Sequence, residues 1–134
     1  MRYLILTALF LLSGCDSPAM ASVPADKAIL AIIGEAESQH YEGMLAVAGA
    51  IRNRGSLRGV YGLKSPRVRK HLYSQKTYDM AETAWIESES VDTSNHATGW
   101  GNEDDINKFC TTTWWSHCVI TAHVGDHWFY RRSR

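Results

Sequence analysis

Two apolar runs, separated by a short polar segment, dominate the first half of the chain. The first run, Pro24 to Ile33, has its apolar residues at helical spacing and predicts a helix with proline at an early position. The second run, Tyr41 to Arg54, predicts another helix, which Gly55 ends as a C-cap. A carboxylate, Glu35, follows the first run directly. The pattern therefore places one acid where the first helix stops and faces the next element.

The pattern after Gly55 is weaker. Residues 55 to 75 show no clear period and predict an ordered loop with one short helical turn. Thr77 is expected to cap a third helix, Tyr78 to Ser88, with its alanines and tryptophan inward. Only the first two helices are therefore strongly indicated.

Two short strands are expected near the end of the chain, at His96–Asn102 and His127–Tyr130, and we expect them to pair. Residues 112 to 124 are expected to be helical or irregular. The chain has 134 residues, of which 45% are hydrophobic and 21% charged, which indicates one globular domain. These elements predict an α+β fold, mostly helical, with a small two- or three-stranded antiparallel sheet.

The N-terminus has the features of an export signal. Arg2 precedes an apolar run, Tyr3 to Leu12, that is too short to span a bilayer as a mature helix. The run closes in Leu12-Ser13-Gly14-Cys15, which resembles the lipobox of bacterial lipoproteins, where the signal is cut before a cysteine that receives lipid. The alternative is an ordinary signal peptide cut near residues 19 to 21, with Cys15 discarded.

The lipobox interpretation divides the chain into three parts: a signal peptide at 1–14, a tether at 15–24 and a folded domain at 25–134. Lipidation of Cys15 would anchor the protein to a membrane. We therefore expect it in the cell envelope, facing the periplasm or the outside.

An extracytoplasmic location changes the interpretation of the two remaining cysteines. Cys110 and Cys118 are expected to form a disulfide, because the compartment is oxidising. Two alternatives stay open at this point. One is a Cys/His nucleophile pair. The other is a zinc site drawn from a cluster whose spacing matches no familiar ligand pattern: Cys110, His117, Cys118, His123 and His127.

Charge gives no reason to expect a nucleic-acid partner, because 14 basic residues balance 14 acidic ones. The distribution is uneven, however. Every charged side chain from Arg52 to Lys76 is basic, and every one from Asp79 to Asp105 is acidic. These segments are either two solvated faces that attract each other or a basic rim that meets an anionic polymer.

Glu35 is the candidate catalytic residue. It follows Ile32-Ile33-Gly34, so part of its surroundings should be apolar. A carboxyl group in such a setting can keep a proton near neutral pH and act as a general acid on a glycosidic oxygen. Most glycoside hydrolases use two carboxylates, and Glu37 and Glu42 are the nearby acids, but spacing alone makes neither a partner.

Several short motifs resemble the SleB-type cell wall hydrolases, the family of spore cortex-lytic enzymes. They are Gly34-Glu35-Ala36, Tyr41-Glu42-Gly43 with Ala46-Val47-Ala48, Ile51-x-Asn53-Arg54, Asn95-His96-Ala97, Trp100-x-Asn102 and Val124-Gly125-Asp126-His127-Trp128-Phe129-Tyr130. The resemblance runs from about Ala28 to Tyr130. One departure follows the glutamate: Glu37-Ser38-Gln39 stands where the family often has Arg-Gly-Glu.

The resemblance implies a lysozyme-like fold and a lytic transglycosylase that cleaves peptidoglycan between N-acetylmuramic acid and N-acetylglucosamine. It implies that Glu35 acts alone, with no metal or other cofactor. We expect a monomer whose groove is formed by aromatic, amide and imidazole side chains that contact sugars: Tyr41, His96, Trp100, Asn102 and His127. An amidase or peptidase, or a non-catalytic wall-binding lipoprotein, remains the alternative.

Overall fold

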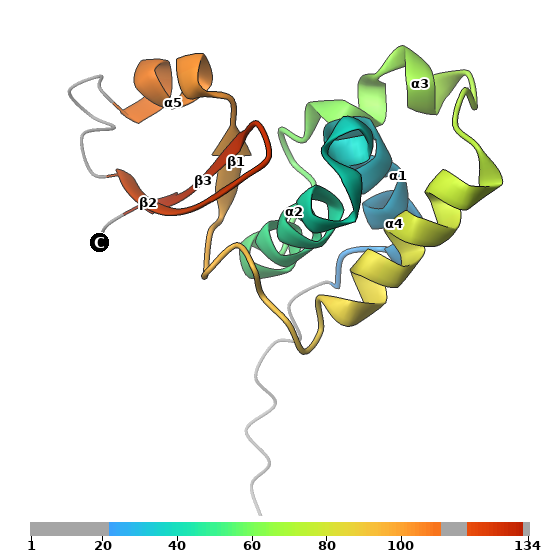
Figure 1. The fold of residues 1–134 in the computed structure, drawn as a ribbon, viewed down its shortest axis with the longest axis horizontal. Coiled ribbons are helices and arrows are strands. Elements are labelled where there is room, and N and C mark those ends of the chain that lie inside the picture. Colours follow the sequence, from blue (N-terminus) through green and yellow to red (C-terminus); the bar gives the residue numbers. More distant parts are fainter. Residues whose placement is uncertain (1–21, 111–117, 133–134) are drawn as a thin grey trace, which may run out of the picture.

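The computed structural model describes residues 22–110 and 118–132, which form a helical layer and a smaller β-sheet side by side (Figure 1). Cys15 and the predicted export signal lie outside the described residues. The elements in chain order are α1 (Ala25–Ala36), η1 (Glu37–Gln39), α2 (His40–Arg54), η2 (Tyr61–Lys64), α3 (Pro66–Arg69), α4 (Gln75–Glu87), β1 (Gly99–Gly101), α5 (Glu103–Cys110), β2 (Cys118–Val124) and β3 (His127–Arg132).

Helix α2 lies at the centre of the molecule. Every residue of α2 from Gly43 to Ile51 is buried, because α1 and α4 pack against it and it also contacts β1 and β2. Three alanines, Ala46, Ala48 and Ala50, are completely buried on this helix. Small side chains let neighbouring helices approach closely, so α2 packs on more than one face.

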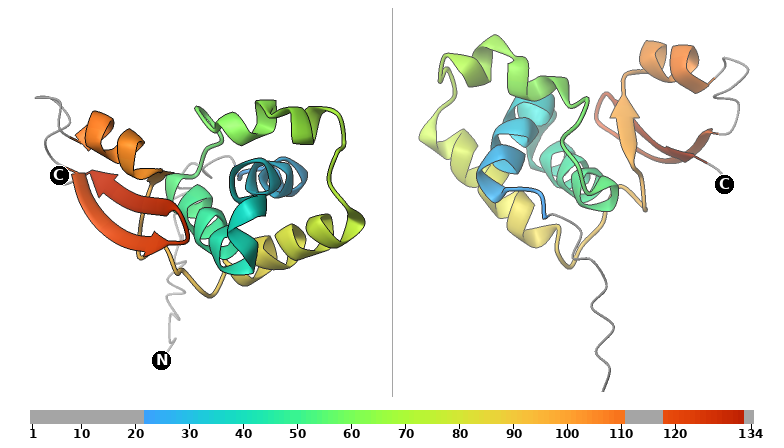
Figure 2. Two further views of the ribbon diagram at one scale, coloured as in Figure 1. Left: turned by 45° about the horizontal axis from the view of Figure 1, so that its top comes forward. Right: turned by 180° about the vertical axis from the view of Figure 1, so that it is seen from behind.

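The sheet is antiparallel with strand order β1-β3-β2 (Figure 2). Phe129 of the central strand is completely buried and joins the sheet to the helical core. Its neighbours Trp100 and Ala122 pair with it from the two outer strands. The fold class expected from the sequence, α+β with a small antiparallel sheet, is confirmed.

Three elements differ from the sequence prediction. Helix α1 continues through Glu35 to Ala36, and α4 begins at Gln75 because Ser74, not Thr77, caps it: the Ser74 hydroxyl accepts from the Thr77 N–H. Residues 118 to 124 form β2, not a helical or irregular segment. This strand lacks clean alternation because it is only half-buried, which hides its period.

Helix α5 was not predicted, although its start carries a recognisable signal. Asn102 and Asp105 cap it reciprocally: the Asp105 N–H donates to the Asn102 Oδ1 (2.8 Å), and the Asn102 N–H donates to the Asp105 Oδ2 (3.3 Å). The first turn is acidic, which stabilises a helix N-terminus. The sequence signal for the start of α5 is therefore Asn-x-x-Asp followed by an apolar residue.

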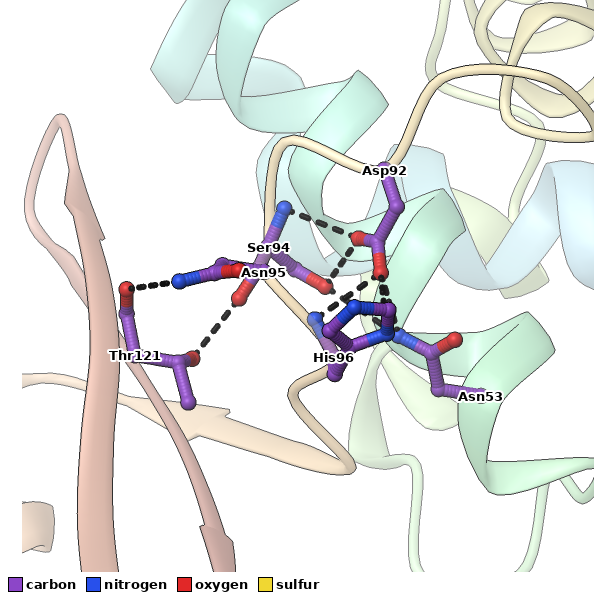
Figure 3. A network of polar contacts seen from close by, with 6 residues as sticks. All are labelled: Asn53, Asp92, Ser94, Asn95, His96 and Thr121. Carbon is purple, nitrogen blue, oxygen red and sulfur yellow. Dashed lines mark hydrogen bonds and ion pairs between the residues drawn. The ribbon is translucent and has the colours of Figure 1, made fainter.

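A polar network around Asp92 joins the helices to the sheet (Figure 3). Asp92 accepts hydrogen bonds from the side chains of Asn53 on α2 (2.9 Å) and Ser94 (2.5 Å), and from the His96 N–H (2.9 Å). Thr121 of β2 donates to the Ser94 carbonyl (2.7 Å). The network therefore fixes the loop that leads into β1.

We expect this network to make stability pH-dependent at acidic pH. Burial raises the pKa of Asp92, but hydrogen bonds from Ser94, Asn53 and His96 more than offset this effect and hold the pKa below its ordinary value of 3.8. As pH falls, the unfolded chain therefore binds this proton first. The stabilisation is present above pH 3.8 and is lost as pH falls through the lower folded pKa.

Replacing Asp92 by asparagine should lower the free energy of unfolding at pH 7 by about 2 kcal/mol. Urea unfolding at pH 7 and at pH 3 measures the free energy of unfolding at each pH. The loss of this free energy between pH 7 and pH 3 should be smaller in Asp92→Asn than in the wild type. Asp104→Asn, an exposed aspartate of α5, is the matched control. Equal pH dependence in Asp92→Asn and the wild type would contradict the assignment.

No helix in the described part of the chain is long and apolar enough to span a bilayer.

Candidate active site

Both oxygens of the Glu35 carboxyl group receive a hydrogen bond. The Gly62 N–H of η2 donates to Oε1 (2.5 Å), and the Trp100 Nε1–H of β1 donates to Oε2 (3.1 Å). One donor comes from the helical layer and the other from the sheet. These contacts fix the direction in which the carboxyl group points.

The close approach of α1 and η2 requires glycine on both sides. A methyl group at Gly34 would lie 2.6 Å from the Gly62 Cα and closer still to its carbonyl group. A methyl group at Gly62 would lie 2.7 Å from the Glu35 Cγ. Glycine at these two positions therefore lets the Gly62 N–H reach the carboxyl group.

A cavity of about 480 Å³ opens beside Glu35. Its walls come from η2, β1, β3 and the start of α5. A methyl group at Gly99 would lie 2.5 Å from the Tyr130 ring, so glycine lets this ring pack against β1. Three residues that the sequence analysis named for the groove line this cavity with Glu35: Trp100, Asn102 and His127. The structure therefore brings these four residues together.

Tyr41 and His96 lie elsewhere. Tyr41 donates to the Glu87 carboxylate, and burial together with Glu87 raises the pKa of Tyr41 to about 12. The His96 side chain is exposed, and its N–H belongs to the Asp92 network. Two motif residues of the sequence analysis, Asn53 and His96, thus contact Asp92 and not the cavity.

The structure adds cavity residues that the sequence analysis missed. Tyr61 of η2 is 76% exposed at the cavity wall, a position in which an aromatic ring can stack on a sugar face. Asp105 brings a second carboxylate, and Arg54 and Tyr130 form the far end. Tyr61 could not be found from the sequence, because residues 55 to 75 show no hydrophobic period. Asp105 could have been found, because it forms the N-terminal cap of α5 together with Asn102.

His127 lines the cavity as a half-buried imidazole. Burial lowers its pKa, and the charges of Glu35, Asp126 and Asp105 oppose that effect without overcoming it. The Nδ1 atom is buried and has no hydrogen-bond partner among residues 22–110 and 118–132. In the neutral ring one nitrogen carries a proton and the other can accept a hydrogen bond.

Two solved structures share this arrangement of elements. The crystal structure of the catalytic domain of the Bacillus cereus SleB protein is 24% identical, with a TM-score of 0.53, over 82% of this chain and 92% of that chain. The catalytic domain of the germination-specific lytic transglycosylase SleB from Bacillus anthracis is 23% identical, with a TM-score of 0.53, over 83% of this chain and 98% of that chain. The fold is that of the SleB catalytic domains. No protein-family model and no curated protein sequence matches the chain.

Within this SleB-like fold, the departure at Gln39 has a structural role. The Asp126 N–H donates to the Gln39 Oε1 (2.6 Å), and the Gln39 Nε2 donates to the Asp126 Oδ2 (3.2 Å). This contact holds the β2–β3 turn against η1, one residue before His127. A glutamate at position 39 would place its negative charge against the Asp126 carboxylate, whereas the neutral amide of Gln39 can donate a hydrogen bond to it.

A second hollow, of about 520 Å³, is also lined by Glu35. Glu37 lines it and is paired with Arg67 through two hydrogen bonds (2.5 and 2.8 Å). Hydrogen bonding to Arg67 lowers the pKa of Glu37, which makes it a poor proton donor at neutral pH. Because Glu35 lines both hollows, it lies at their junction.

Cys110 at the end of α5 and Cys118 at the start of β2 form the expected disulfide, with their Cα atoms 5.4 Å apart. In this form neither sulfur can act as a thiolate nucleophile or as a zinc ligand. His117 of the zinc alternative lies outside the described residues, and His123 stacks on Trp128, with the ring centroids 4.1 Å apart. The geometry thus favours Glu35 over the cysteines as the reactive group.

Proposed function

We propose that the protein cleaves the glycan strand of peptidoglycan between N-acetylmuramic acid and N-acetylglucosamine, as a lytic transglycosylase. The supporting observation is the position of Glu35, which lines two hollows and receives a hydrogen bond on each carboxyl oxygen. A polymer across this junction has sugars on both sides of the acid. One neighbour of the same fold is named as a lytic transglycosylase.

In the proposed reaction, protonated Glu35 gives its proton to the glycosidic oxygen while the bond from that oxygen to C1 of muramic acid breaks. The C6 hydroxyl of the same sugar attacks C1, and its proton returns to the Glu35 carboxylate. The products are a 1,6-anhydro ring and a free sugar hydroxyl, and no water is consumed. Each carboxyl oxygen has two lone-pair sites, so one donor per oxygen leaves room for the transferred proton.

Mass spectrometry of the muropeptides released from sacculi tests this proposal. We expect 1,6-anhydromuramyl ends, because the nucleophile belongs to the sugar. Reducing ends would instead mean hydrolysis with an activated water, for which Asp105 is the available carboxylate. Free stem peptides would mean an amidase, and the absence of any product would leave a wall-binding protein.

We also propose that the protein is a lipoprotein of the cell envelope, anchored through Cys15 and acting as a monomer. The lipobox-like segment supports the anchor, and the disulfide is consistent with an oxidising compartment. Expression in bacteria fed a labelled fatty acid should give a labelled wild-type protein in the membrane fraction. Cys15→Ala should carry no label, and equal labelling of both proteins would contradict the anchor.

A further inference from the structure

A third hollow, of about 310 Å³, adjoins the cavity beside Glu35 and shares part of its lining. It is lined by Arg54, Thr98, Tyr130 and Arg132, of which Arg54 and Tyr130 also line the cavity beside Glu35. Tyr130 and Arg132 are two residues apart on β3, so both point to the same face of the sheet. The hollow is therefore a side branch of the proposed glycan site.

The charge of this hollow is positive. Two guanidinium groups line it, and none of its lining residues within 22–110 and 118–132 carries a carboxylate. Both charges reach Tyr130: burial raises the pKa of its hydroxyl group, Arg54 and Arg132 oppose that effect, and the more weakly acting charge of Asp105 adds to it. Arg54 donates to the Arg58 carbonyl group, which satisfies one N–H but does not neutralise the positive charge.

Muramic acid supplies the complementary group. Its O3 carries a lactyl group, which ends either in a free carboxylate or in a stem peptide that carries carboxylates of its own. The planar guanidinium fork of arginine matches a carboxylate and binds it through paired hydrogen bonds. A glycan built from N-acetylglucosamine alone has no such group, so contacts here would distinguish the two polymers.

We infer that Arg54 and Arg132, with the Tyr130 hydroxyl, form a subsite for a carboxylate on the lactyl branch of muramic acid; the inference rests on the proposed glycan substrate. Arg132 is the better residue to test, because Arg54 and Tyr130 also line the cavity beside Glu35. Arg131, the exposed neighbour on β3 outside this lining, is the matched control.

The test uses the full-length protein in detergent and three soluble glycan strands. The first carries stem peptides, the second has been freed of peptide by an amidase, and the third is the second with its lactyl carboxylates converted to neutral amides. The wild type should cleave the amidated strand with kcat/KM about tenfold lower than the better of the other two. Arg132→Gln should lose that discrimination, whereas Arg131→Gln should keep it.

The first two strands identify the source of the carboxylate. Equal cleavage of both assigns the subsite to the lactyl carboxylate, and preference for the first assigns it to the peptide. Wild-type protein that does not discriminate against the amidated strand would overturn the inference. The inference would also be overturned if Arg132→Gln lowered kcat/KM by the same factor on every strand.

Binding separates this inference from the proposed function. Titration of Glu35→Gln with each strand, followed by the fluorescence of tryptophan in the cavity, needs no catalysis. Failure of the wild type to cleave any strand would reject the transglycosylase proposal alone. Equal affinity of Glu35→Gln for all three strands would reject the carboxylate subsite alone.

Discussion

Glu35→Gln should lower the rate of glycan cleavage by about 1,000-fold while the protein stays folded. The amide oxygen of glutamine can accept one of the two hydrogen bonds that hold the carboxyl group, so the side chain keeps nearly the same position. What it loses is the transferable proton. Release of soluble muropeptides from sacculi measures the rate, and circular dichroism checks the fold.

Three other acids serve as matched comparisons. Glu42→Gln removes an exposed acid at the start of α2 and should leave the rate unchanged. Glu37→Gln breaks the pair with Arg67, and Asp105→Asn removes the other carboxylate of the cavity; both should keep most of the activity. A loss in Asp105→Asn as large as that in Glu35→Gln would replace the single-acid reaction with a two-carboxylate reaction.

Gly34→Ala should lower the free energy of unfolding by about 3 kcal/mol and also reduce activity. The added methyl group meets the backbone of Gly62, which cannot rotate away as a flexible side chain would. Helix α1 and η2 must therefore separate, which moves the Gly62 N–H away from Glu35. Urea unfolding and muropeptide release measure the two effects.

Lys27→Ala is the control on the same helix, because this side chain is largely exposed. It should unfold at the same urea concentration as the wild type and cleave at the same rate. Normal stability together with normal activity in Gly34→Ala would show that η2 yields easily, which would contradict the argument for a tight contact.

The sequence predicts well those elements that bury either one whole face or all of their residues. Helices α1 and α2 have strong apolar patterns because they form the core. Strand β2 was missed because half-buried residues do not alternate cleanly along it. Helix α5 was missed because its cap was overlooked, although Asn102 and Asp105 carry the signal.

The candidate site was predictable only in part. Glu35 stood out through its position after an apolar run, and Trp100, Asn102 and His127 line the cavity beside it. Tyr61 gave no signal, because its role depends on the path of a loop without a period. Asn53 and His96 belong to the motifs found in the sequence, but they do not line the cavity. Both donate hydrogen bonds to Asp92, which fixes the loop before β1.

The two donors to Glu35 have an implication for the order of folding. Gly62 is 27 residues from Glu35 along the chain, and Trp100 is 65 residues away on the other layer. A chain that has formed only its helices would contain the acid and one donor, but not the second donor or the cavity wall. The carboxyl group therefore gains its full orientation only when the sheet has docked on the helices, so a partly folded chain lacks the reactive geometry.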